Sequence, residues 1–441
     1  MDHLKGHYGH EASAKVNQAV YIVDAARTPF LEAGGRPGPF SAADLATACG
    51  AQLLARQPFA PDELDQVILG CSSPAPDETN IARLASLRMG CGDRVPAWTV
   101  QRNCASGLQA LDCASVEIAL GRADLVLAGG VDAMSRAPLL LSDDFVEWLS
   151  AWRSAGAVQR LRLLRRLYSS RLAPATGLER GLNDPAAGLL QGQVAEDLAT
   201  RFAISRDEQD AWALRSHQRA AAAWSAGRLD EIVPLVGPDG RLHVADAGVD
   251  GDVDAAGLAS LKPCFDRKYG NVTSGNSARP GDGAGWLVLA SADALERHAL
   301  TPLVRIVDCA WAALDPVATG LGPVHATAPM LARNGLTIDD IGLWEVNEAF
   351  AAHVLACLQA WSDADWCREE LGIDCGGKAP PHSRINIDGG AIALGDPVAA
   401  SSARIVMHLA AAMRREGARH GVATLCIGGG QGGAMLLETV A

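Results

Sequence analysis

The chain has 441 residues, of which 49% are hydrophobic and 20% charged, so it is too long for one ordinary core and too apolar to be disordered. Its formal net charge of −13 argues against nucleic acid as a partner, and no apolar run reaches the ~18 residues that a transmembrane segment needs. Residues 1–18 are polar and lack the apolar core of a secretory signal, so we expect a loose tail there and a cytoplasmic location.

Short apolar segments alternate with segments rich in alanine and leucine along the chain, which is the pattern of an α/β protein. Buried strands are predicted within 19–30, 64–73 and 123–134, and the last two are expected to stop at glycine. A helix of small residues is predicted in "NCASGLQALDCASVEIAL", residues 103–120.

The segment 144–270 differs from the rest and is predicted to be an insertion that covers one face of the first half. Ser205 and Glu208 fit a capping box at the start of a long helix. Residues 153–171 predict one basic amphipathic helix. Its apolar residues are Val158, Leu161, Leu164, Tyr168 and Leu172, and its arginines include Arg160, Arg162, Arg165 and Arg166. Such a helix is either solvated or binds a partner subunit, anionic lipid or phosphate groups.

A faint repeat indicates two halves of similar build. "LVLAGGVDAM" (125–134) is similar to "LCIGGGQGGAM" (425–435) in having an apolar strand, a glycine turn and a methionine. Each follows a helix of small residues, although chance similarity between glycine-rich turns is the alternative. We expect residues 19–143 and 271–297 to form the first half and 298–441 the second.

Two of the eleven cysteines lie in places suited to chemistry, whereas most are expected to be reduced and buried. Cys104 is predicted at a helix N-terminus, where free amides and the helix dipole lower a thiol pKa and can bind an oxyanion. Cys426 is predicted at a strand end that faces three glycines, with an ordinary buried cysteine as the alternative. Asn347 ends an apolar run and is either a helix cap or a site residue.

Five segments together strongly resemble the thiolase family in order and spacing, from about Val20 to Ala441. They are "AARTPF", "NCASGLQAL", "NEAFAA", "NIDGGAIALG" and "CIGGGQGGAM". The insertion and "SHQRAAAAWSAGRLDEIVPL" most resemble the β-subunits of fatty-acid-oxidation trifunctional complexes. Against that subfamily, its usual His-Glu-Ala-Phe is here Asn347-Glu348-Ala349-Phe350.

The resemblance implies an α/β fold in which two similar βα halves form a five-layered αβαβα sandwich with an inserted loop domain. It implies coenzyme A and acyl-CoA as substrates, no metal and no other cofactor. It also implies a homodimer or a higher homo-oligomer, with a β-oxidation α-subunit as a further candidate partner. The reaction would be thiolysis of a 3-ketoacyl-CoA in fatty-acid β-oxidation, or the reverse condensation.

The same resemblance implies roles for individual residues. Cys104 would carry the acyl group, and Cys426 would exchange a proton with the acetyl α-carbon. Asn347 would orient a water in one oxyanion hole, and the backbone amides of Cys104 and Gly428 would form the second. Ser277, in "NVTSGNS", would contact the substrate.

Asp396 departs from the family pattern. The family motif Gly-His-Pro is here Gly-Asp-Pro, so Asp396 stands where the family has its catalytic histidine, and Ser402 stands at a common glycine position. An ionised carboxylate raises a nearby thiol pKa and cannot donate a hydrogen bond. Asp396 could still take a proton as a weak base, or be protonated and donate if burial raised its pKa. We therefore expect slow thiolysis; the alternative is a weakly catalytic subunit that binds acyl-CoA or a partner protein. His353 and His382 are candidate substitutes, although an ordinary helix or loop histidine is the simpler interpretation of each.

Overall fold

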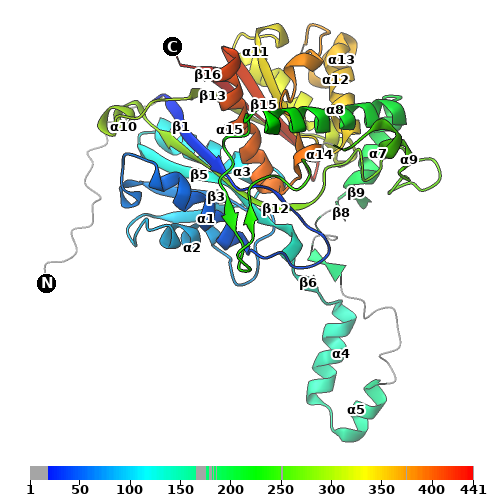
Figure 1. Cartoon of the computed structure of the whole chain (residues 1–441). Coiled ribbons are helices and arrows are strands. Elements are labelled where there is room, and N and C mark those ends of the chain that lie inside the picture. Colours follow the sequence, from blue (N-terminus) through cyan, green and yellow to red (C-terminus); the bar gives the residue numbers. More distant parts are fainter. Residues whose placement is uncertain are drawn as a thin grey trace, which may run out of the picture.

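The computed structural model describes residues 18–164, 175–177, 181, 183–184, 186–249, 252–373 and 375–440. Its centre is one mixed ten-stranded sheet (Figure 1). In spatial order the strands are β14 (Leu343–Val346), β15 (His420–Ile427), β16 (Gln431–Thr439), β13 (Val304–Ala313), β1 (Val20–Arg27), β12 (Gly281–Ala290), β5 (Leu125–Ala133), β3 (Gln66–Gly70) and β4 (Ala97–Val100), with β2 (Leu31–Glu32) paired to β12.

Two buried helices separate the two halves of this sheet. Helix α3 (Ser106–Ala119) packs on β3 and β5, and α15 (Val398–Glu416) packs on α3 and on strands of both halves. Helices α1 (Ala42–Ala55) and α2 (Ile81–Arg88) cover one outer face, and α11 (Gly322–Arg333) and α12 (Ala351–Ser362) lie on the other. The expected α/β sandwich is confirmed, with β1 and β13 hydrogen-bonded across the junction of its halves.

Other helices and short strands lie outside the ten-stranded sheet. They are α7 (Gln191–Arg201), α8 (Arg206–Ser225), α9 (Ala255–Ser260), α10 (Ala292–Arg297), α13 (Ala364–Leu371), α14 (Ala391–Leu394) and the two-residue strands β6 (Leu139–Leu140), β7 (Ala175–Thr176), β8 (Asn183–Asp184), β9 (Leu189–Leu190), β10 (Leu235–Val236) and β11 (Leu242–His243). Ser205 and Glu208 form the predicted capping box of α8. Among the described residues, no helix is long and apolar enough to cross a membrane. The half and insertion boundaries stay predictions.

One feature of the predicted repeat is wrong. Gly129 and Gly130 do not stop their strand, because β5 continues to Ala133. At both glycines, strand β5 instead lies very close to the backbone of another segment. A β-carbon at Gly129 would lie 2.0 Å from the Gly285 oxygen, and one at Gly130 would lie 2.0 Å from the Ala399 oxygen. Only glycine lets a strand lie this close to its neighbours.

The basic stretch is not the single helix expected from its periodicity. Helix α4 (Asp143–Ser154) ends before Gly156, α5 (Ala157–Leu164) follows, and residues 165–171 lie outside the described part. The two helices pack on each other and project from the body (Figure 1). Phe145, Trp148 and Trp152 stack along α4, and Arg160 lies over Trp152. On α5, Val158 and Leu161 are 70% and 65% exposed.

We expect the triple variant R153Q/R160Q/R162Q to weaken one of three associations at least several-fold and to keep its fold, because these arginines are exposed on a projecting hairpin (Figure 1). The measurements are coenzyme A affinity, co-sedimentation with anionic liposomes, and assembly with a β-oxidation α-subunit. A matched variant, Arg297→Gln, changes an arginine on α10 instead. If all three associations stay at wild-type strength, the hairpin is merely a solvated surface.

Candidate active site

Cys104 lies in a tight turn immediately before α3. Asn103 adopts a left-handed conformation (φ 44°), which asparagine tolerates better than most residues. The Ser106 hydroxyl closes the turn by accepting from the Arg102 amide at 2.9 Å and donating to the Asn103 carbonyl at 2.7 Å. The turn therefore holds the Cys104 thiol at the N-terminal end of a buried helix.

Cys426 lies near the end of β15 and is followed by the turn at 428–430. The Asn103 side chain donates to the Gly428 carbonyl at 2.9 Å, which joins this turn directly to the Cys104 turn. The Gly428 amide also interacts with the Cys104 sulfur. The Gly429 amide donates to Asp184, so the insertion reaches over the same turn. The two cysteine segments, far apart in sequence, thus form one site.

Asn347 follows β14, the parallel neighbour of β15. The backbone amide of Asn347 donates to the Thr424 carbonyl at 3.0 Å, so Asn347 lies at the same sheet edge as Cys426. It is not a cap, because α12 begins at Ala351 after Phe350. Asn386 braces the strand from the side by pairing with both backbone groups of Val346 at 2.8 Å. The side-chain oxygen of Asn347 has no hydrogen-bond partner among the described residues.

Asp396 lies between α14 and α15 and is 6% exposed. Pro397 is the N-cap of α15, so the carboxylate is not a helix cap. The Asp396 amide donates to the Arg279 carbonyl at 2.8 Å. Burial raises the pKa of the carboxyl, and the nearby Ser401 hydroxyl and Asn347 side chain offset this only in part. Its Oδ1 atom has no hydrogen-bond partner of ordinary geometry in the described part of the chain.

The electrostatics of Cys104 oppose the expectation from its helix position. Burial is the main cause that raises its thiol pKa to about 11, and the charge of Asp396 adds to it. The Gly428 amide, from the turn after β15, and the Cys104 backbone amide lower the pKa, but by less. Burial, Cys104 and Asp396 likewise raise the pKa of Cys426. The prediction of a lowered thiol pKa at Cys104 is therefore wrong. Asp396 raises that pKa in the expected direction, and its effect on thiolysis stays a prediction.

Ser277 lies on the segment that joins the Asn347 region to Asp396. Its backbone bridges to Phe350, and Pro280 on the same segment bridges to Asp396. The Ser277 hydroxyl donates to the Thr273 carbonyl at 2.7 Å, which leaves its oxygen free to accept. The position is compatible with substrate contact, and the role stays a prediction.

Two residues that sequence reasoning missed or left unexplained support the site. Asp132, fully buried at the end of β5, accepts from the Ser72 hydroxyl and from the Ala399 amide at 2.7 Å. The sequence does contain a signal for Asp132, because it is the one carboxylate near the end of an otherwise apolar strand. Ser402 accepts from the Leu108 amide at 3.1 Å, so it satisfies one of the free amides of α3.

His353 and His382 have different positions. Nδ1 of His353 lies 3.6 Å from the Cys426 sulfur, and the ring is 2% exposed. His382 is exposed and makes an edge contact with Trp212. The simpler interpretation therefore holds for His382, while His353 belongs to the site.

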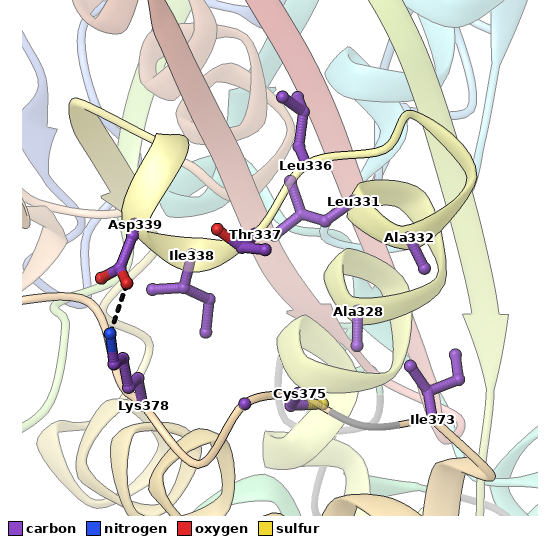
Figure 2. Close-up of a pocket in the computed structure, with 11 residues that line it drawn as sticks. Ala328, Leu331, Ala332, Leu336, Thr337, Ile338, Asp339, Ile373, Cys375 and Lys378 are labelled. Carbon is purple, nitrogen blue, oxygen red and sulfur yellow. Dashed lines mark hydrogen bonds and ion pairs between the residues drawn. The ribbon is translucent and has the colours of Figure 1, made fainter.

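A separate pocket of about 380 Å³ lies between α11, the turn at Ile338–Asp340, and a third group of lining residues, Ile373, Cys375, Gly376 and Lys378 (Figure 2). An ion pair between Asp339 and Lys378 closes one side. None of its lining residues is a candidate site residue. Among the described residues, no cluster of three or more histidine, cysteine or acidic side chains could hold a metal ion.

The raised pKa of Cys104 changes the expected order of thiol reactivity. Sequence alone predicts that Cys104 is the most reactive of the cysteines. We now expect limiting iodoacetamide at pH 7 to label the exposed Cys264 first, because Cys104 holds little thiolate. Asp396→Asn should increase labelling of Cys104 several-fold and leave Cys264 unchanged, as read by peptide mass spectrometry. Faster labelling of Cys104 in the unaltered protein would show that its thiolate is stabilised despite Asp396.

Comparison with known proteins gives a consistent picture. Residues 20–293 match the family model "Thiolase, N-terminal domain", and residues 300–439 match "Thiolase, C-terminal domain". The chain is 38% identical to the β-ketoadipyl-CoA thiolase of Pseudomonas aeruginosa, over 96% of this chain and 100% of the relative. It is 35% identical to a 3-ketoacyl-CoA thiolase of Yersinia pestis, over 95% and 96% of the two chains.

Solved structures agree. The acetyl-CoA acetyltransferase of Bacillus anthracis superposes with a TM-score of 0.83 at 33% identity, over 97% of this chain and 100% of that one. Human mitochondrial 3-ketoacyl-CoA thiolase gives a TM-score of 0.82 at 34% identity, over 96% and 99%.

Proposed function

The chain belongs to the thiolase family, and we propose that it is a 3-ketoacyl-CoA thiolase in which Cys104 carries the acyl group. One observation carries the proposal: the turn that holds Cys104 is hydrogen-bonded to the turn after Cys426, through the Asn103 side chain and the Gly428 carbonyl at 2.9 Å. A soft nucleophile beside amide donors suits attack on a carbonyl next to a thioester. The proposal includes a cytoplasmic homodimer that acts in fatty-acid β-oxidation.

The proposed thiolysis has two stages. The Cys104 thiolate attacks the 3-keto carbon, the bond between carbons 2 and 3 breaks, and the acetyl-CoA carbanion takes the proton of the Cys426 thiol. Coenzyme A then gives its thiol proton to the Cys426 thiolate, and its sulfur attacks the acyl-Cys104 thioester. This step releases the shortened acyl-CoA and restores the Cys104 thiolate. The Cys104 and Gly428 amides would stabilise one oxyanion, and a water held by Asn347 the other.

Stoichiometric acylation tests this proposal. The protein is incubated with a 3-ketoacyl-CoA or with acetyl-CoA, and the adduct is located by mass spectrometry of its peptides. One acyl group per chain on Cys104, absent in Cys104→Ala, is the expected result. An unmodified Cys104 in folded protein, or an adduct only elsewhere, would overturn the nucleophile assignment.

The second candidate is a thiolase-fold subunit that binds acyl-CoA with little turnover. The observation that favours it is the negative charge of Asp396 beside a Cys104 thiol whose pKa is raised to about 11. At that pKa about 10⁻⁴ of the thiol is ionised at pH 7. Coenzyme A binding without acylation of Cys104 would select this function.

A further inference from the structure

His353 is placed against Cys426 by the first turn of α12. Nδ1 lies 3.6 Å from the sulfur, within hydrogen-bonding distance for a thiol. The Phe350 ring packs edge-on against the imidazole, with centroids 5.0 Å apart. On the other side, a β-carbon at Gly320 would lie 2.5 Å from the imidazole Cδ2, so only glycine leaves room for the ring. The imidazole is thus held in one position beside one sulfur.

The surroundings of His353 do not suit a merely structural histidine. The side chain is 2% exposed, and its Nε2 atom has no hydrogen-bond partner among the described residues. Leaving a buried polar nitrogen unpaired destabilises the folded protein, a cost that an apolar side chain of similar size avoids.

Both groups are neutral in the resting protein. Burial lowers the pKa of His353 to about 4, so the imidazole is uncharged at pH 7. Cys426 keeps its proton, because burial and the neighbouring Cys104 and Asp396 raise its pKa. The arrangement that fits both is a Cys426 S–H that donates to a bare Nδ1, with the imidazole proton on Nε2.

We propose that His353 is the proton partner of Cys426. In the condensation direction, the Cys426 proton moves to Nδ1, and the thiolate then takes a proton from the acetyl α-carbon of acetyl-CoA. The carbanion attacks acetyl-Cys104, a carbon–carbon bond forms, and Cys104 leaves as a thiolate. That thiolate takes a proton from the Cys426 thiol, and the proton on Nδ1 of His353 returns to Cys426. All three residues then have the protons with which they began. Thiolysis runs the same steps in reverse.

This inference rests on the proposed function and concerns only its carbanion half. Acylation of Cys104 by acetyl-CoA needs no proton transfer at the α-carbon, whereas exchange of the acetyl protons with D₂O does. The two halves are therefore measured separately, by peptide mass spectrometry and by the loss of the acetyl proton signal.

The test compares His353→Gln with His382→Gln, which changes an exposed histidine in the same way. His353→Gln should slow α-proton exchange by ~10²-fold or more, the usual effect of removing a catalytic base, and should flatten its pH profile. His382→Gln should behave as wild type. Exchange in His353→Gln at the wild-type rate would overturn the inference, whether or not Cys104 is acylated.

A double-mutant cycle that combines His353→Gln with Cys426→Ser tests whether His353 acts through the Cys426 thiol. The cycle also guards against a single variant that misfolds. Exchange in H353Q/C426S should be no slower than in Cys426→Ser alone, because the two residues work as a unit. Independent, additive losses would overturn the pairing.

The pairing is also tested without any substrate. Methyl methanethiolsulfonate should modify Cys426 several-fold more slowly in His353→Gln at pH 7, because no imidazole accepts the thiol hydrogen bond and takes the proton as the sulfur attacks. Equal rates would overturn the pairing even if Cys104 proves unable to carry an acyl group, a result that would by itself remove the proposed function.

Discussion

Replacing Asp396 with histidine is expected to raise thiolytic turnover at least ~10²-fold, the effect usual for one catalytic group. The substitution removes the carboxylate charge, which contributes to the raised pKa of Cys104. It also places a neutral imidazole, which can accept a thiol proton and donate to an oxyanion, where the backbone is already fixed by Gly395, Pro397 and the Arg279 carbonyl. Turnover is measured with acetoacetyl-CoA and with a longer 3-ketoacyl-CoA.

Asp396→Asn is the matched control, because it removes the charge without supplying a base. We expect it to raise the rate of Cys104 acylation several-fold and to fall well short of the histidine variant. If the histidine variant folds and turns over no faster than wild type, another residue already activates Cys104, or thiolysis is not the natural reaction.

Replacing His408 with glutamine is expected to lower the free energy of unfolding by about 3–5 kcal/mol at pH 6.5, the usual result of removing one member of a buried ion pair. His408 lies in α15, is 1% exposed, and has Asp388 at 3.1 Å and Glu231 at 3.4 Å. Burial alone would lower its pKa, but Glu231 and Asp388 raise it to about 10. The imidazolium therefore joins α15 to the insertion.

The pH dependence of this effect has a fixed sign. Because the pKa of His408 is raised in the folded protein, the stability that its charge contributes is complete below the ordinary pKa near 6.5. This stability is lost as the pH rises through about 10. Urea unfolding at pH 6.5, 8 and 9.5, at one protein concentration, should show the difference from wild type shrinking steadily. His420→Gln, which removes a partly exposed histidine 3.5 Å from Glu438, should change stability by less than about 1 kcal/mol. A difference for His408→Gln that does not vary with pH would show that its effect is packing rather than charge.

The fold and the family were predictable from the chain alone, because they depend on local pattern. Apolar strands, small-residue helices and glycine turns are set by residues near one another in sequence, and five such segments in order define the thiolase family. The same reason made it possible to name Cys104, Cys426, Asn347 and Gly428, since each lies within one of those segments, and Asp396, which directly follows "NIDGGAIALG". The basic helix failed because its periodicity continued through the point where the structure ends α4 and begins α5.

Only the tertiary structure decided the chemistry within the site. Sequence placed Cys104 at a helix N-terminus and predicted a lowered thiol pKa, but burial and a carboxylate 292 positions away in the numbering raise it to about 11. Sequence also gave no reason to prefer His353 over His382, since nothing local distinguishes a histidine that meets the Cys426 sulfur from one that faces solvent. Desolvation and charge–charge interaction depend on distance in space and on the exclusion of water, and neither is set until helices and strands from both halves have packed together.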